Sequence, residues 1–325
     1  MKKAIITGIT GQDGAYLAKK LLNEGFEVIG FVSNNSMSND RFNLRYLGII
    51  DEIRYCGVDL TNKDDVMAIV EKERPHQIYN LAAQSSVAKS FSNPGETLAF
   101  NFNSVINILE SVLAVDKTIR FYQASSSEMF GKVKNLPVKI EHPLNPISPY
   151  AVSKVAAHHT VKSYRTAYGL YAVSGVLFNH ESYLRSPNFF CKKIIRQGIE
   201  IANGKRDVLE LGNIEVKRDF GYGPDYVDAM YKMLQQIEPR DYIISSGESI
   251  SLKEIVYQVF DLLGISHDKI VINPELYRPE EIEDIYGDNT LAKRLLGWNY
   301  NKDFFSVLRL LIDEELKNSK EIEHK

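Results

Sequence analysis

Tyr150 and Lys154 lie four residues apart in the segment SPYAVSK, a spacing that places both side chains on one face of a helix. A free tyrosine has a pKa of about 10 and is a poor base at neutral pH. A nearby positive charge favours the phenolate and lowers that pKa toward the working range. On its own, the Tyr-x-x-x-Lys spacing is more often a packed tyrosine beside a solvated lysine. Other features must therefore decide whether this pair is catalytic.

A run of hydroxyl side chains followed by a carboxylate, in YQASSSEMFG, comes directly after an apolar, strand-like segment. Ligands of parallel sheets bind at the carboxyl ends of the strands. Ser126 is therefore predicted to hydrogen-bond a substrate hydroxyl beside Tyr150, and Glu128 to lie in the same loop. A serine run is more often only a solvated loop, but its position at the end of a strand favours a function.

Three glycines, Gly8, Gly11 and Gly14, follow the first apolar segment in TGITGQDG. Glycines at this point let the backbone turn tightly, approach a pyrophosphate closely and pack a helix against a strand. The N-terminus of the following helix would bind the phosphates through its amide groups and its dipole. A glycine triplet alone is a weak signal. Its place between a first strand and a first helix predicts a dinucleotide, which beside Tyr150 and Lys154 would be a nicotinamide dinucleotide.

The adenine-side ribose of such a cofactor is recognised just past the second strand, where an acidic residue favours NAD and an arginine favours NADP. The segment there, GFVSNNSMSNDR, offers Asn34 and Asn35, which can hydrogen-bond a ribose without charge, and Arg41 as the nearest cation. We therefore expect NAD to be favoured over NADP. Asp59, after the third strand, either meets the adenine amino group or caps a helix that begins near Thr61.

The elements that must position these residues alternate between β-branched runs and helical patterns in the first half of the chain. Six segments are predicted as strands: Ala4–Thr7, Phe26–Val32, Ile53–Val58, Gln77–Leu81, Arg120–Ala124 and Ala172–Leu177. Helices are predicted at Gly14–Asn23, from Thr61 to before Pro75, at Gly95–Leu113 and at Ser148–Tyr168. This alternation predicts an α/β fold with a doubly wound parallel sheet of the Rossmann type.

Beyond Asn179 the alternation fades. Helices are predicted at Asn188–Asn203, Pro224–Gln236, Ser251–Leu263 and Asp303–Lys317, and short strands at Tyr242–Ser246 and Lys269–Ile272. No Pro/Ser-rich linker divides the chain, so this part is predicted to fold over the ligand edge of the sheet as a smaller α/β substrate-binding region. We expect residues 1–178 with about 213–246 to form the dinucleotide-binding domain. Residues from about 179 to 212 with 247–325 would form the nucleotide-sugar-binding domain, with a loose tail from Lys317.

The composition, 44% hydrophobic and 25% charged in 325 residues, is that of a soluble globular protein. The formal net charge of −3 supplies no basic surface for nucleic acid or for an anionic membrane. No apolar run is expected to span a membrane, and the short apolar start is expected to be a buried strand, not a signal peptide. Cys56 and Cys191 lack metal-ligand spacing, so no metal is predicted and a reducing, cytoplasmic location is expected.

Several sequence motifs, taken together, resemble those of a known family. TGITGQDGAYLA, NLAAQSSV, FYQASSSEMFG, SPYAVSK and LFNHES resemble the extended short-chain dehydrogenase/reductases and, within them, the GDP-mannose 4,6-dehydratases. The match continues through LGNIEVKRDFGYGPDYVDAM, YRPEEIE and LGW and covers nearly the whole chain. The glycine and Tyr/Lys motifs indicate only the superfamily, whereas NHES, KRDFG and RPEE are typical of the GDP-sugar 4,6-dehydratases.

The resemblance implies an internal redox reaction on a GDP-hexose, with GDP-mannose the first choice and NAD(P) tightly bound. Tyr150, assisted by Lys154 and Ser126, would take the proton of the C4 hydroxyl while hydride passes to the cofactor. Glu128 would remove the C5 proton and help water leave from C6, before hydride returns to C6. The product is a 4-keto-6-deoxy sugar. The resemblance also suggests a homodimer or a homotetramer.

The binding sites are predicted from these motifs and from the family pattern. The residues predicted to bind the cofactor are Gly8, Gly11, Gln12, Asp13, Gly14, Asn34, Asn35, Arg41, Asp59, Leu60, Leu81, Ala82, Ala83, Tyr150, Lys154, Leu177, Asn179 and His180. The residues predicted to bind the substrate are Ser85, Ser126, Glu128, Asn179, Lys193, Arg218, Arg278 and Glu281. Arginine and lysine suit the diphosphate, and a glutamate can accept hydrogen bonds from guanine. Any one of these cations, taken alone, would be interpreted as part of a surface salt bridge.

Several positions depart from the family pattern. Typical members carry two arginines where Asn34 and Asn35 lie, and a threonine where Ser126 lies. The stretch TLAFNFNSV and Ile147 also differ, near the sugar and nicotinamide side. The hexose could therefore be GDP-N-acetylglucosamine or a GDP-manno-heptose.

Two other functions are compatible with parts of the pattern. A nucleotide-sugar 4-epimerase or reductase on the same fold needs Tyr150 and Lys154 but not Glu128. A non-catalytic dinucleotide sensor needs none of these residues, although Ser126, Tyr150 and Lys154 are all present. Glu128 is the residue that separates a dehydratase from the first alternative.

Overall fold

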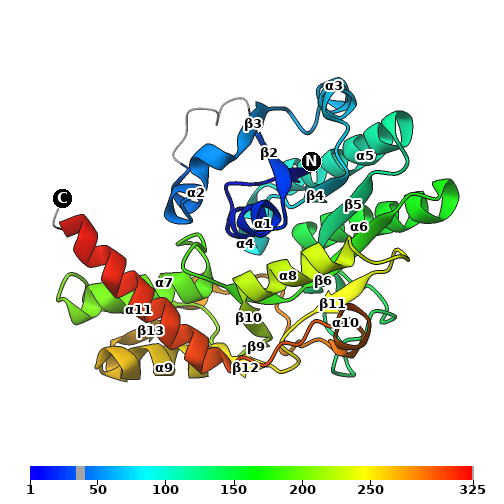
Figure 1. The fold of residues 1–325 in the computed structure, drawn as a ribbon. Helices are drawn as coiled ribbons and strands as arrows, with labels where there is room; N and C mark the ends of the chain where they lie inside the picture. The colour runs from blue at the N-terminus through cyan, green and yellow to red at the C-terminus, as the bar shows by residue number, and fades with distance from the viewer. Residues whose placement is uncertain (34–40, 324–325) are drawn as a thin grey trace.

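The computed structural model describes residues 1–33 and 41–323, with side chains described up to residue 318. Within this part of the chain, seven parallel strands form one central sheet (Figure 1). The strands are β1 (Lys2–Thr7), β2 (Phe26–Val32), β3 (Arg54–Gly57), β4 (Gln77–Asn80), β5 (Arg120–Ser126), β6 (Ala172–Leu177) and β11 (Tyr242–Ile244). Their order is β11-β6-β5-β4-β1-β2-β3, so the sheet grows in opposite directions from β1 and β4. Ligands of doubly wound sheets bind at such a reversal, beyond the carboxyl ends of the strands.

The doubly wound sheet and the six predicted strands are confirmed. β5 runs two residues further than predicted, through Ser126, because it still pairs with β6 after its pairing with β4 has ended at Asn80. β11 lies within the strand predicted at Tyr242–Ser246, but it pairs with β6, so the central sheet has seven strands and not the six that were counted. A strand of three residues carries too little periodicity to be placed in a sheet from its sequence.

Helices cover both faces of this sheet (Figure 1). α1 (Gln12–Asn23) and α8 (Gly223–Met233) pack against each other and share one apolar core with the sheet. α3 (Lys63–Glu73), α5 (Pro94–Val115) and α6 (Pro149–Tyr168) share the core on the opposite face. Successive side chains along each buried strand point to opposite faces of the sheet, so each strand contributes to both cores.

The ends of the helices follow local capping rules. The Ser148 side chain accepts a hydrogen bond from the Ala151 amide and begins α6, and Gly169, with a φ of 71°, ends it. At α3 the predicted cap, Thr61, is wrong. Asn62 is the cap, and its side chain accepts from two backbone amides in the first turn. Thr61 instead donates its amide and hydroxyl groups to Asp59.

A second region with its own apolar core lies beyond the ligand edge of the sheet (Figure 1). Its helices are α7 (Phe190–Ala202), α9 (Leu252–Leu263) and α11 (Phe304–Glu323), and its parallel strand pair is β8 (Leu209–Leu211) with β13 (Ile270–Ile272). Two further pairs join it to the sheet: β7 (Asn179–Glu181) with β10 (Phe220–Tyr222), and β9 (Lys217–Arg218) with β12 (Ile250–Ser251). Short helices α2 (Phe42–Tyr46), α4 (Val87–Ser92), α10 (Thr290–Leu296) and turns η2 (Ile50–Glu52), η3 (Ser127–Phe130), η4 (His267–Lys269) and η5 (Pro274–Leu276) complete the described part.

The C-terminal helix is longer than predicted. The expectation of a loose tail from Lys317 is wrong up to Glu323, where α11 ends. The Asn318 side chain donates to the Glu314 carbonyl one turn earlier and continues the helical surface. Up to Glu323, this polar stretch is therefore the last segment of a helix and not a loose tail.

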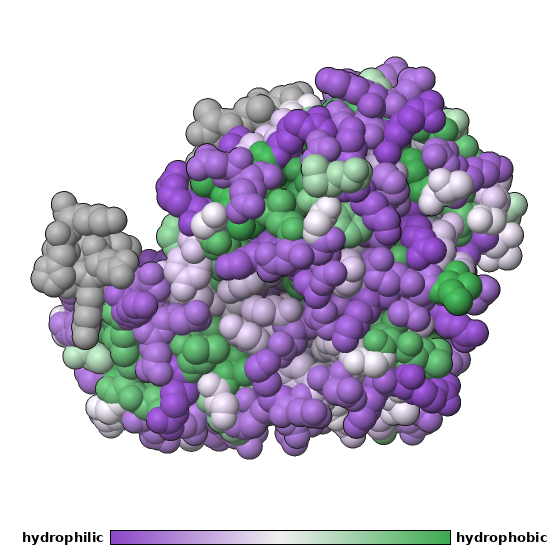
Figure 2. All heavy atoms as spheres, viewed as in Figure 1, coloured by the Kyte–Doolittle hydropathy of each residue, from purple (hydrophilic) through white to green (hydrophobic). Residues whose placement is uncertain are grey.

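α5 is long and apolar enough to cross a membrane by length and composition alone. Its polar side chains Asn101, Ser104, Asn107 and Ser111 are nevertheless buried, and the helix packs against α3 and α6. This is the composition of a core helix. The face seen in Figure 2 is mostly hydrophilic, with hydrophobic groups in small separate patches.

Candidate active site

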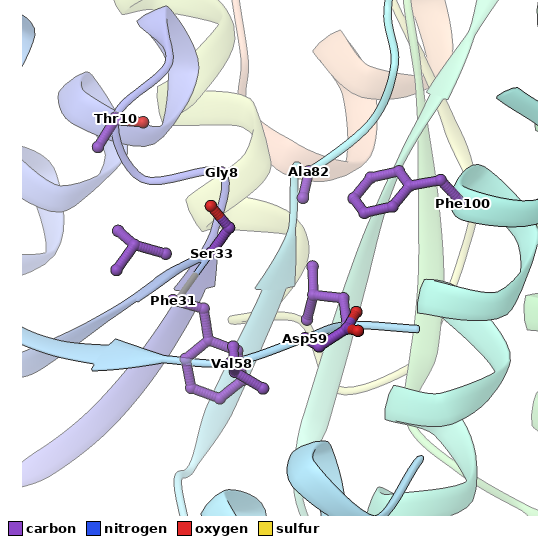
Figure 3. Close-up of a pocket in the computed structure, with 10 residues that line it drawn as sticks. Gly8, Thr10, Phe31, Ser33, Val58, Asp59, Ala82 and Phe100 are labelled. Atoms are coloured by element: carbon purple, nitrogen blue, oxygen red, sulfur yellow. The ribbon is translucent and has the colours of Figure 1, made fainter. Parts of the chain in front are cut away.

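Gly8 and Thr10, in the glycine turn between β1 and α1, line a cavity of about 540 Å³ (Figure 3). Gly8 has a φ of 67°, and a Cβ there would lie 2.9 Å from the Ala82 amide nitrogen. A Cβ on Gly14 would lie 2.3 Å from the Gly8 carbonyl oxygen. Both positions therefore need glycine so that the helix can start against the strand. The cavity and the α1 N-terminus meet here, as a bound diphosphate requires.

The walls of this cavity come from the ends of β1, β2 and the loops after β3 and β4. Of the predicted cofactor residues, Gly8, Asp59, Leu60 and Ala82 line it. Figure 3 shows the Asp59 carboxylate beside the cavity. Because α3 begins at the Asn62 cap, the alternative role of Asp59 as a helix cap is wrong. Thr10, Phe31, Val32, Ser33, Val58 and Phe100 also line the cavity and were not predicted from the sequence.

The segment after β2 is only partly described. Asn34 and Asn35 lie outside the described residues. The Arg41 guanidinium lies 3.6 Å from the centroid of the Tyr55 ring and stacks on it. Arg41, the cation nearest to the segment predicted to recognise the ribose, is thus engaged with the Tyr55 ring.

Gln12, Asp13 and His180 contact one another behind the glycine turn. His180 Nε2 lies 3.0 Å from both Asp13 carboxylate oxygens, and Gln12 Nε2 donates to Asp13 Oδ1 at 3.0 Å. Burial alone would raise the pKa of Asp13, but the His180 ring, which attracts its charge, lowers it to about 2. The Ser182 hydroxyl donates to Gln12 Oε1. These residues thus fix α1 to β7.

Tyr150 and Lys154 are both buried on the first turns of α6. Lys154 Nζ donates to the Ala124 carbonyl at 2.9 Å and lies 5.7 Å from the Tyr150 ring centroid. Burial raises the pKa of Tyr150 to about 12, although a hydrogen bond with Ser126 opposes the rise. Burial also lowers the pKa of Lys154 to about 8. The predicted lowering of the tyrosine pKa is therefore not produced by the protein groups, because desolvation outweighs the neighbouring charges.

Ser126 ends β5, and Glu128 lies on the short turn η3 that follows it. The Ser126 hydroxyl accepts from the Glu128 amide at 3.3 Å and is also within hydrogen-bonding reach of Tyr150. The negative charge of Glu128 raises the pKa of Tyr150 and opposes the lowering of the Arg218 pKa by burial. The structure thus brings together all four predicted catalytic residues and adds a cation, Arg218, beside the carboxylate.

Three predicted substrate residues meet opposite this turn. Arg218 donates to Glu281 Oε1 at 2.6 Å and to the Ile282 carbonyl at 2.6 Å, and Arg278 donates to the same Glu281 oxygen at 3.3 Å. Arg218 is buried and Arg278 is exposed. Glu281 therefore orients two arginines through Oε1, and its predicted role as an acceptor for guanine stays a prediction.

The other predicted substrate residues lie around this group with different exposure. Asn179 begins β7 and is half-buried, and Ser85 is exposed in the loop after β4. Lys193 is on α7, and its Nζ donates to the Glu210 carbonyl at 3.0 Å. Leu81, Ala83 and Leu177 lie at or just beyond the ends of β4 and β6, on the ligand edge.

Arg185 was missed in the sequence. Its guanidinium lies 3.6 Å from the buried Glu181 carboxylate and 3.7 Å from the centroid of the Phe189 ring. Its positive charge lowers the pKa of Tyr150 and of Asp13. Arg185 lies three residues beyond the NHES string, outside the motif, so the sequence carried no direct signal for it. Among the described residues, no group of three or more His, Cys, Asp or Glu side chains could hold a metal ion.

The sequence matches the model of one protein family, described as GDP-mannose 4,6 dehydratase, over residues 5–311. The chain is 40% identical to GDP-mannose 4,6 dehydratase 2 of Arabidopsis thaliana over 98% of its own length and 88% of the relative. It is 37% identical to the human GDP-mannose 4,6 dehydratase over 97% of its own length and 91% of the relative.

Solved structures share the fold at lower identity. A dTDP-glucose 4,6-dehydratase of Bacillus anthracis in complex with NAD has a TM-score of 0.85 at 20% identity, with 98% of both chains covered. The RMD protein of Pseudomonas aeruginosa, complexed with NADPH, has a TM-score of 0.79 at 23% identity, covering 96% of this chain and 98% of that one. These likenesses confirm the Rossmann-type architecture over the full length.

Proposed function

Because the chain belongs to the GDP-mannose 4,6-dehydratase family, we propose that it converts GDP-mannose to the GDP-4-keto-6-deoxy sugar with loss of water. The observation that carries this proposal is the common position of Tyr150, Ser126 and Glu128 at the carboxyl end of β5. A 4-epimerase or reductase requires the tyrosine but has no use for a carboxylate beside it. The family match likewise disfavours a non-catalytic sensor.

A nicotinamide dinucleotide fits the cavity beside the glycine turn. A side chain at Gly8 would meet the Ala82 backbone and one at Gly14 would meet the Gly8 carbonyl, so the two glycines let the end of β1 and the start of α1 lie close together beside the cavity. A nicotinamide bound there would supply a reversible hydride acceptor for oxidation at C4 and reduction at C6. We propose that the cofactor is tightly bound and is NAD in preference to NADP. The stacking of Arg41 on Tyr55 supports this choice, because it engages the cation nearest to the segment that recognises the ribose.

The protein groups supply the proton transfers. Tyr150, assisted by Ser126 and by the ammonium of Lys154, takes the proton of the C4 hydroxyl. Oxidation at C4 makes the C5 hydrogen acidic. Glu128 then removes the C5 proton, and the same carboxyl group protonates the C6 hydroxyl as it leaves as water. Glu128 therefore ends the elimination as it began. When C6 is reduced, C5 takes up one proton, and the proton that Tyr150 took from the C4 hydroxyl balances it directly or through solvent, so the net change is the loss of one water.

The nucleotide part of the substrate would lie across the second region. We propose that Arg278 and Arg218 face the diphosphate and that Asn179, Lys193 and Ser85 line the way to it. Arg218 is held by the Ile282 carbonyl and by Glu281, so its guanidinium is oriented in advance.

The larger organisation belongs to the same proposal. Residues 1–178 with about 213–246 would hold the cofactor, and about 179–212 with 247–325 would hold the GDP-sugar. We propose a homodimer or homotetramer, for which the exposed Val152 and Tyr168 on α6 offer contacts, and a cytoplasmic location.

The test is direct. The purified protein is incubated separately with GDP-mannose, GDP-N-acetylglucosamine and GDP-manno-heptose without added cofactor, and mass spectrometry follows the loss of one water. We expect dehydration of GDP-mannose above the other two. Absence of dehydration with all three would overturn the proposal. The nucleotide released on denaturation identifies NAD or NADP.

A further inference from the structure

A chain of buried hydrogen bonds crosses the central sheet beside the nucleotide cavity and ends at Lys154. Thr7, Asn80 and Gln123 stand in register on β1, β4 and β5, so their side chains share one face of the sheet. Thr7 Oγ1 donates to Asn80 Oδ1 at 2.6 Å, and Asn80 Nδ2 donates to Gln123 Oε1 at 2.8 Å. Gln123 Nε2 donates to the Ala124 carbonyl at 3.0 Å, the same carbonyl that accepts from Lys154 Nζ.

Backbone amides determine which group donates and which accepts in each of these hydrogen bonds. The amides of Leu81 and Ala82 both donate to Thr7 Oγ1, at 3.1 and 3.0 Å. These two bonds use the acceptor positions of the hydroxyl, so its one proton must go to Asn80. The Asn80 oxygen then faces Thr7, its amino group faces Gln123, and Gln123 in turn presents its amino group to Ala124.

Water cannot reach these side chains to replace their hydrogen bonds. Thr7 and Asn80 are fully buried, and Gln123 is 2% exposed. A buried amide that loses its partner keeps the cost of desolvation without compensation. Each member therefore constrains the next one along the chain.

The two ends of the chain lie at different parts of the site. At one end, Ala82 lines the cavity, and its amide would lie 2.9 Å from a Cβ on Gly8. At the other end, Ala124 lies in the part of β5 that has passed its last pair with β4, at Asn80 and Gln123. The Ala124 carbonyl is thus held by Gln123 at a place where the sheet no longer supplies a β4 neighbour.

We propose that Asn80 and Gln123 are positioning residues that hold the Ala124 carbonyl on the Lys154 ammonium and couple this contact to the Leu81–Ala82 wall of the cofactor cavity. The inference rests on the proposed function only for the catalytic role of Lys154. Thr7 connects the two ends, because its hydroxyl bonds both the Leu81 and Ala82 amides and the Asn80 side chain. Neither amide touches the reacting atoms.

Two substitutions test the coupling from different ends. Gln123→Leu removes the contact with Ala124, and Thr7→Val removes the hydroxyl two strands away while keeping the side-chain shape. Both should move the alkaline limb of the kcat–pH profile to lower pH by roughly half a unit, because the ammonium loses support from its acceptor. Both should also raise the dissociation constant of the cofactor about threefold or more. Thr7→Ser restores the hydroxyl and should return both quantities to wild-type values.

The matched control is Ser125→Ala, which removes a buried hydroxyl on the same strand that contacts His158 and not this chain. It should lower the melting temperature but leave the pH profile in place. If Thr7→Val and Gln123→Leu lower only the melting temperature, the coupling is absent. If Gln123→Leu does not fold, Thr7→Val with its serine rescue decides. The pH dependence of cofactor binding without any sugar gives the same answer if GDP-mannose proves not to be the substrate, so the two proposals fail separately.

Discussion

Burial shifts the pKa values of the two central side chains of the site, Tyr150 and Lys154, in opposite directions. It holds the Tyr150 phenol in its protonated form, with a pKa of about 12, and brings the Lys154 ammonium close to losing its proton, with a pKa of about 8. Only the charged lysine can support the phenolate that removes the C4 proton. Catalysis should therefore depend on the protonation of Lys154.

This dependence predicts the pH profile of turnover. As the pH rises through about 8, Lys154 is deprotonated and kcat should fall. Lys154→Arg keeps a charge that does not titrate in this range, so the alkaline limb should move to higher pH even though kcat is lower. Initial rates between pH 6 and about 10 measure both profiles. An unchanged limb in the arginine variant would remove Lys154 from this role.

Glu128 should separate oxidation from elimination. Glu128→Gln keeps the size of the side chain but cannot take the C5 proton, so loss of water should fall about 100-fold or more. Oxidation at C4 should persist and appear as reduced cofactor absorbance in the first turnover. The matched control is Glu280→Gln, at an exposed glutamate that pairs with Lys132 on the surface. Equal dehydration by Glu128→Gln and wild type would exclude the carboxylate from the reaction.

At the scale of elements, the glycine turn determines how closely α1 packs against the end of β1. Gly14→Ala would place a Cβ 2.3 Å from the Gly8 carbonyl oxygen, so the turn must open and cofactor should be lost on purification. Gly95→Ala is the matched control, because nothing lies within 4 Å of its added Cβ and the helix gains a better helix former. The ratio of bound nucleotide to protein, from the absorbance of the denatured supernatant, compares the variants. Full occupancy in Gly14→Ala would contradict the assignment of the cavity.

A buried carboxylate joins the second region to the sheet. Asp219 accepts from the amides of Ser246, Gly247 and Gly287. Burial nevertheless raises its pKa from 3.8 to about 6. A carboxyl group with a raised folded-state pKa contributes stability that is complete below the unfolded value and is lost as the pH rises through the folded value.

Wild-type stability should therefore fall, relative to Asp219→Asn, as the pH rises from about 4 to about 6. The asparagine variant lacks the titrating group, so the difference between the two proteins isolates this residue. Urea unfolding midpoints at intervals of half a pH unit supply the measurement. A constant difference across the window would show that the Asp219 pKa is not raised.

The sequence predicted the elements with strong patterns and missed those that depend on single contacts. The six strands and the α6 caps were predictable because hydrophobic runs and the Ser148 and Gly169 signals are local. The α3 cap was misplaced by one residue, since Thr61 and Asn62 are both good caps and only the bond between Thr61 and Asp59 decides between them. Arg185 could not be assigned because its effect on Tyr150 arises from tertiary packing.

At the scale of the whole molecule, the site exists only where the two regions meet. The sheet side supplies the cavity, Tyr150 and Glu128, and the linking strand β9 supplies Arg218. The second region supplies Glu281, which orients Arg218. A substrate that bridges both regions must carry a sugar at one end and an anionic group at the other. This division fits a GDP-sugar.

The central claim is an internal transfer of hydride from C4 to C6 with loss of one water. The most direct measurement uses GDP-mannose deuterated at C4, incubated with the purified protein without added cofactor and analysed by NMR and mass spectrometry. We predict one product that lacks one water and carries the deuterium on C6. A product without that deuterium, or recovery of unchanged GDP-mannose, would contradict the claim.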